Sequence, residues 1–293
     1  MKLIIKRNRI YIVICIICLF VMLYFMTSST NFGYILKQYI SSEDYRQLIW
    51  TNDGIGFLEF VPEAERSIFR LIWVILTKTP YQFDVSIIFG TALFSIFLPL
   101  FPMICTYDFY RYYHSIYKSA AYRGKGYRAD LDHTMHHNAL KMAGTLFLSY
   151  FIYMCIVKAA ASEPNGAPYR SLLHEIFNDR FYGEHTFIYF FIEGSIRFFW
   201  MPYIYCRMGQ AAVLYESDWK KPVFLPALYY YGLTAAGMAL ANVIPVLSIY
   251  ISPAVLMANG DFEFNSFILL AVNAIPMILA WLMTYYKTRY VEI

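Results

Sequence analysis

The chain has 293 residues, of which 59% are hydrophobic and only 15% are charged, and its formal net charge is +4. Soluble globular domains carry about a quarter charged residues, so this composition excludes that class and favours an integral membrane protein. The basic residues alternate with acids and tyrosines, which argues against a nucleic-acid-binding surface.

The first apolar stretch covers about residues 10–26 and follows four basic residues, Lys2, Lys6, Arg7 and Arg9. The apolar run is longer than the core of a typical signal peptide, and residues 27–31 contain no cleavage site of the A-x-A type. We therefore expect a retained first span whose amino end lies in the cytoplasm.

Residues 31–84 mix acidic, basic and apolar side chains and are predicted to form an external segment. Within it, residues 67–76 are amphipathic enough to lie along the membrane surface, with Trp73 as an anchor.

Further apolar stretches approach the roughly 20 residues that a helix needs to cross about 30 Å of hydrocarbon. They predict spans at about 86–106, 142–161, 186–206, 223–250 and 267–285. Because the apolar run from Val223 to Met257 is too long for one crossing, we expect its far end to bend into a short re-entrant or interfacial helix. The fold class is an all-α integral membrane protein with about six transmembrane helices.

Lys and Arg are more frequent on the cytoplasmic side of membrane proteins. With the amino end inside, 15 of the 24 Lys and Arg residues fall in inner segments and eight in outer ones. The last outer loop contains Asp261 and Glu263 and no basic residue. The distribution predicts that both termini are cytoplasmic.

A long cytoplasmic loop, residues 108–141, joins the second and third spans and carries six basic residues and four histidines. Its two ends are expected to be helical extensions of the neighbouring spans. Between them lies the elbow, which we define as Tyr122, Arg123, Gly124, Lys125, Gly126, Tyr127 and Arg128. Aromatic and Arg side chains are typical anchors of protein interfaces, so the elbow is a candidate docking element. A solvated loop is the alternative.

The six spans, the external segment and the run LPLFPMICTYDFYRYYHSIYKSAAYRGKGYR resemble the ABC-2-type permeases, the membrane subunits of ATP-binding-cassette exporters. The resemblance covers most of the chain as architecture and about residues 95–141 as motif. It implies a bacterial cytoplasmic-membrane permease that pairs with a second permease subunit or a copy of itself. It also implies a separate ATPase that docks on the elbow.

The sequence contains no G-x-x-x-x-G-K-[ST] phosphate-binding loop. Under the permease hypothesis the chain is therefore not itself an enzyme and holds no cofactor, and ATP is bound by the partner ATPase. Lipid, peptide, antibiotic and sugar chain all remain open as cargo.

Two other function classes stay open. His133, His136 and His137 match the HxxHH box of membrane-bound di-iron hydroxylases and desaturases, and neutral imidazole is a good iron ligand. Such enzymes need about eight histidines in several boxes, whereas this chain has six in total. A non-transporting immunity or sensor subunit would show the same loop without a transport pathway.

Glu193 and Arg197 lie four residues apart within the fourth predicted span. Charges at membrane depth are costly and usually pair or line a polar cavity. They are expected to form an internal ion pair, with a role in a polar pathway or in partner contact as the alternative. The five cysteines lie in or beside apolar segments and are expected to be reduced.

Overall fold

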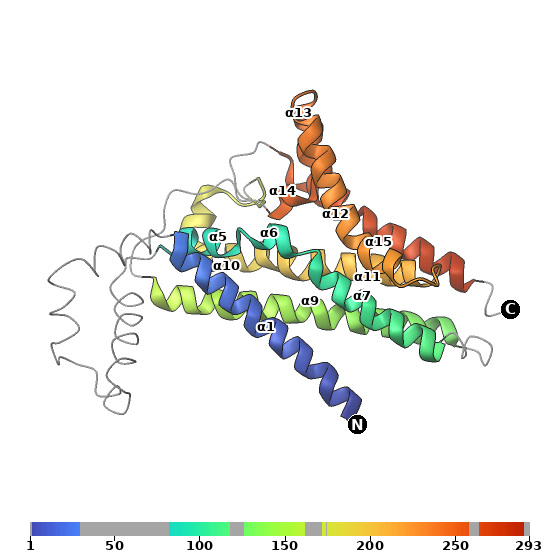
Figure 1. Ribbon diagram of the computed structural model, residues 1–293. Helices are drawn as coiled ribbons and strands as arrows, with labels where there is room; N and C mark the ends of the chain where they lie inside the picture. Colours follow the sequence, from blue (N-terminus) through green and yellow to red (C-terminus); the bar gives the residue numbers. More distant parts are fainter. Residues whose placement is uncertain are drawn as a thin grey trace, which may run out of the picture.

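The computed structural model describes residues 2–29, 82–117, 126–161, 172–173, 175–257 and 264–289. Most of the predicted external segment and elbow residues 122–125 lie outside these ranges. The described part is helical, joined by turns and short irregular segments (Figure 1). Within the described ranges, four helices are long and apolar enough to cross a membrane: α1 (Lys2–Ser29), α9 (Tyr127–Ala160), α12 (Lys220–Leu240) and α15 (Ser266–Thr288). The described part is thus all-α, with helices able to span a membrane.

The second predicted span, 86–106, is not one continuous helix. It is divided among α5 (Phe83–Thr91), α6 (Phe94–Phe97) and α7 (Leu100–Tyr112), and a π-helical turn extends α7 to Tyr117. Pro99 is the N-cap of α7, and the backbone N–H that proline lacks is not needed for helical hydrogen bonding at that position. The proline therefore marks a break and a new start, and α7 continues well past residue 106.

The fourth predicted span, 186–206, is also interrupted. It consists of α10 (Asp179–Ser195), the π-helix η3 (Ile196–Trp200) and α11 (Met201–Val213), and α10 is kinked at His185, where φ is −128° and ψ is 36°. Pro202 lies at the start of α11. Its ring would clash with the carbonyl four residues earlier, and a π turn there widens the backbone and relieves the clash.

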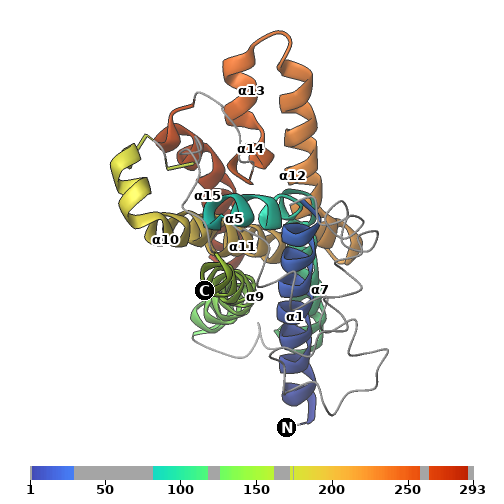
Figure 2. The same ribbon diagram turned by 90° about the vertical axis from the view of Figure 1, so that its left-hand side faces the viewer.

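The fifth predicted span, 223–250, is not one continuous helix, and the chain bends after Leu240, as the excess length of the apolar run led us to expect. α12 ends at Leu240, and α13 (Pro245–Ile251) folds back along it to form a hairpin, followed by α14 (Pro253–Met257) (Figure 2). Pro245 starts α13 after Ile244, which has a non-helical φ of −137°. Gly237 permits the close approach, because a Cβ there would lie 2.8 Å from the Ser252 Cβ.

α9 is the longest of the described helices, and α1, α7 and α11 pack against it (Figure 1). The amino end of α9, the turn between α11 and α12, and the carboxyl end of α15 lie at one end of the bundle, on the right in Figure 1. The α12–α13 hairpin projects away from the bundle axis (Figures 1 and 2). The contacts between α9, α11 and α15 described next lie at the end from which α9 starts, whereas the Glu193–Arg197 pair lies further along, beside Tyr150.

Candidate functional site at the amino end of α9

Three of the seven elbow residues are described. Gly126 is the N-cap of α9 and has a φ of 102°, a left-handed conformation that glycine adopts with little strain. Tyr127 is buried with 8% of its surface exposed. The Arg128 guanidinium lies over the Tyr285 ring of α15, 4.8 Å from its centroid. These three residues fix the start of α9, whereas residues 122–125 lie outside the described ranges.

The helices that flank the loop extend beyond the predicted spans, as expected from the sequence. α7 with its π-helical turn reaches Tyr117, and α9 runs without a break from Tyr127 to Ala160. At 1.5 Å per residue, the 34 residues of α9 are about 51 Å long, some 20 Å more than the hydrocarbon core of a bilayer. One stiff helix thus leads from the elbow into the apolar part of the protein.

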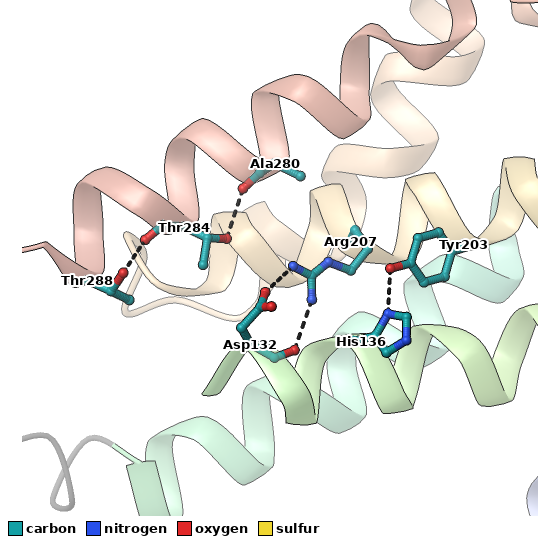
Figure 3. Close-up of polar contacts among 7 residues, drawn as sticks. All are labelled: Asp132, His136, Tyr203, Arg207, Ala280, Thr284 and Thr288. Atoms are coloured by element: carbon teal, nitrogen blue, oxygen red, sulfur yellow. Dashed lines mark hydrogen bonds and ion pairs between the residues drawn. The ribbon is translucent and has the colours of Figure 1, made fainter. Parts of the chain in front are cut away.

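Asp132 of α9 and Arg207 of α11 form an ion pair (Figure 3). The Arg207 Nη2 donates to Asp132 Oδ1 at 2.5 Å, and Nη1 donates to the Asp132 carbonyl oxygen at 3.2 Å. The Arg207 side chain is only 5% exposed, against 54% for Asp132. Arg207 is the first residue after the fourth predicted span, 186–206, so the sequence placed it in the inner loop that follows that span. Its burial against α9 is a feature that sequence reasoning missed.

His136, one turn further along α9, contacts Tyr203, one turn back along α11 (Figure 3). Its Nδ1 lies 2.7 Å from the Tyr203 hydroxyl oxygen. Together with the Asp132–Arg207 ion pair, this contact makes two successive polar connections between α9 and α11. The signal in the sequence is the i, i+4 spacing within each helix, but the pairing across helices depends on tertiary structure.

The three histidines of the HxxHH box do not converge on one point. His136 is engaged by Tyr203, while the rings of His133 and His137 stack on each other with centroids 6.1 Å apart. Among the residues that the structure describes, no three His, Cys, Asp or Glu side chains are grouped so that they could hold a metal ion. The predicted box therefore forms two separate contacts in the described structure.

α15 and the turn after α11 close this end of the bundle. The Tyr215 hydroxyl donates to the Met283 carbonyl oxygen at 2.6 Å, and the Lys287 Nζ lies 5.2 Å from the centroid of the Tyr215 ring. Thr284 and Thr288 are buried, and each donates its hydroxyl to the carbonyl oxygen four residues earlier in α15 at 2.8 Å (Figure 3). α7 joins the same assembly, because the Tyr110 hydroxyl donates to the Ser217 carbonyl oxygen.

The Glu193–Arg197 ion pair predicted in the fourth span is present and almost completely buried, with side chains 0% and 5% exposed. It lies across the junction of α10 and η3. Tyr150 of α9 packs beside it, stacked on Phe198 at 4.6 Å, and donates its hydroxyl to the Phe190 carbonyl oxygen at 2.8 Å. The pair thus has the geometry of an internal i, i+4 contact.

A second buried acid was not singled out in the sequence. Asp84, at the start of α5, is fully buried and accepts a hydrogen bond from the Tyr182 hydroxyl at 3.1 Å and one from the backbone N–H of Val85 at 2.8 Å. Asp84 belongs to the predicted external segment, and the mixed composition of that segment gave no reason to expect the Asp84 side chain to be buried.

The chain matches no known family model, no curated protein and no solved structure. Its function is therefore argued from its own residues.

Proposed function

We propose that the chain is a permease subunit of an ATP-driven exporter of the ABC-2 type in a bacterial cytoplasmic membrane. In this proposal α1, α9, α12 and α15 are four of six spans, and the bent segments α5–α7 and α10–α11 are the other two. Both termini and the 108–141 loop face the cytoplasm. A separate ATPase docks on the elbow and hydrolyses ATP, and a second permease subunit or a copy of this chain completes the pathway.

The observation that carries the proposal is the continuity of α9. A single helix starts at the Gly126 cap, within the elbow, and continues for 34 residues. Its first turns are joined to α11 by the Asp132–Arg207 ion pair and to α15 by the Arg128–Tyr285 contact. A force applied at the start of α9 would therefore reach α9, α11 and α15 together.

The proposed cycle follows from this arrangement. Closure of the ATPase dimer on ATP pushes the elbow, and α9 tilts with the helices that are fixed to it. Such rigid-body movement of helices is a common way to alternate between inward-open and outward-open states. The cargo would pass along a pathway shared with the second subunit.

Affinity purification of the tagged protein from its native membrane tests the proposal. We expect an ATPase chain to be recovered with it, and to be lost with the variant Tyr122→Ala/Arg123→Ala. Tyr127 is left unchanged because it is buried, so its replacement would perturb the fold. The matched control is Arg180→Ala, which removes an exposed arginine from an ion pair on α10.

Three results would count against the proposal. Recovery of the same ATPase with wild type and the elbow variant would remove the elbow from docking. Bound iron without an ATPase would favour the hydroxylase class instead. Recovery of neither would favour an immunity or sensor subunit.

A further inference from the structure

The two polar connections between α9 and α11 share one geometric pattern. Asp132 and His136 are four residues apart on α9, and Arg207 and Tyr203 are four residues apart on α11 in the opposite order along the chain. The two contacts therefore lie on one face of an antiparallel helix pair, one turn apart (Figure 3).

The charged contact is asymmetric. Arg207 is buried with a side-chain exposure of 5%, and its Nε makes no hydrogen bond within the described part of the chain. Asp132 is the acidic partner with which Arg207 forms an ion pair. A buried guanidinium that loses its carboxylate is strongly unfavourable, so any sliding of α9 along α11 is opposed by the charge left behind.

At the equivalent positions one turn away, the sequence of α9 offers Arg207 no second carboxylate when the helices slide. One turn towards the amino end, the position equivalent to Asp132 is Arg128, which already lies over Tyr285. One turn towards the carboxyl end it is His136. A shift by one turn in either direction would thus place Arg207 against Arg128 or His136, neither of which is a carboxylate.

The same holds from the side of α11. A shift by one turn would bring Asp132 opposite Tyr203 or Ala211, and neither is a cation. The present alignment is therefore the only one of these three in which the buried arginine meets a carboxylate.

We propose that Asp132, Arg207, His136 and Tyr203 form a register lock that makes α9 and α11 move as one rigid body during the transport cycle. Arg207 is then a positioning residue that acts through α9. This inference rests on the proposed function, since the cycle supplies the force against which the lock acts.

The test uses the complex of this chain with its co-purified ATPase in lipid nanodiscs, and distances between pairs of spin labels measured by pulsed electron paramagnetic resonance. In a background without the native cysteines, one label pair, Ile156→Cys on α9 and Trp200→Cys at the N-cap of α11, reports sliding of α9 along α11. A reference pair, Ile156→Cys and Val243→Cys, reports movement of the α12–α13 hairpin relative to α9. The labelled side chains are exposed at 37%, 53% and 74%, respectively.

With ATP and orthovanadate, the reference distance should change while the Ile156–Trp200 distance stays constant in the wild-type background. In Arg207→Met the Ile156–Trp200 distance should also become nucleotide-dependent, with a shift of up to one helical turn, about 5 Å. Arg207→Lys keeps a cation opposite Asp132 and should restore the constant distance. Arg180→Ala should behave as wild type.

The outcomes separate the two proposals. If the reference distance does not respond to nucleotide, the exporter proposal fails. If it responds and Arg207→Met keeps a constant Ile156–Trp200 distance, the register lock is wrong and the exporter proposal stands. A response in both Arg207→Met and Arg180→Ala would also overturn the lock, because the effect would then not be specific to this pair.

Discussion

Within the Asp132–Arg207 ion pair, removing the aspartate should cost clearly more stability than removing the arginine. Asp132→Ala leaves the Arg207 guanidinium, whose side chain is 5% exposed, without its carboxylate. Breaking a fully buried pair in this way costs about 3–5 kcal/mol. Asp132 is 54% exposed, so water will reach part of the vacated space, and we expect about 2–3 kcal/mol.

Arg207→Met removes the buried charge itself and retains an unbranched side chain in its place. The Asp132 carboxylate is half exposed and can then be hydrated by water, so the free energy of unfolding should fall by only about 1 kcal/mol. The double variant Asp132→Ala/Arg207→Met should be as stable as Arg207→Met, because once the buried arginine is absent no charge there needs the Asp132 carboxylate as a partner.

Denaturant titration in mixed micelles, followed by circular dichroism, measures these free energies of unfolding. Arg180→Ala serves as the control for an exposed arginine pair and should lose less than about 1 kcal/mol. If Asp132→Ala costs no more than Arg207→Met, Arg207 is not a buried charge that depends on Asp132, and the reasoning is refuted.

Three predictions concern glycines. Gly126→Ala should destabilise the protein by about 1 kcal/mol, because the φ of 102° at this position is strained for any residue but glycine. The control Gly144→Ala, also in open space but within α9, should be neutral or slightly stabilising. Equal midpoints of the two variants in thermal unfolding would contradict this. Gly194→Ala should cost at least about 2 kcal/mol in the same assay, because the new Cβ would lie 1.9 Å from the Tyr150 ring; an unchanged midpoint would mean that the two helices do not pack so closely. Gly237→Ala should separate α13 from α12, since its Cβ would lie 2.9 Å from the Ser248 carbonyl oxygen; faster hydrogen exchange confined to residues 245–251 would be the sign, and unchanged exchange the contrary result.

The sequence predicted the long apolar helices well, because hydropathy depends on local composition. The predicted span 267–285 corresponds to α15 at Ser266–Thr288, and the helical lead into the third span is the first part of α9. Helix continuity was harder to predict. Pro202 was visible in the sequence, but the π turn before it depends on how the backbone accommodates its ring.

The residues of the candidate site were predicted less completely, since burial is set by packing between distant segments. Arg207 follows directly after the fourth predicted span and was placed in the next inner loop, and only the approach of α9 shows that it is buried. Asp84 was hidden for the same reason, because its partner Tyr182 is 98 residues away. In contrast, the Glu193–Arg197 pair was predictable because both partners lie on one helical face.

The exporter account depends most directly on the claim that the elbow lies on the cytoplasmic side of the membrane. Lys125→Cys, in a background without the native cysteines, can be treated with a membrane-impermeant maleimide in right-side-out and inside-out vesicles. The account predicts labelling only in inside-out vesicles, and protection of the same cysteine when the ATPase is bound. Labelling in right-side-out vesicles would place the elbow on the outer face and contradict the account.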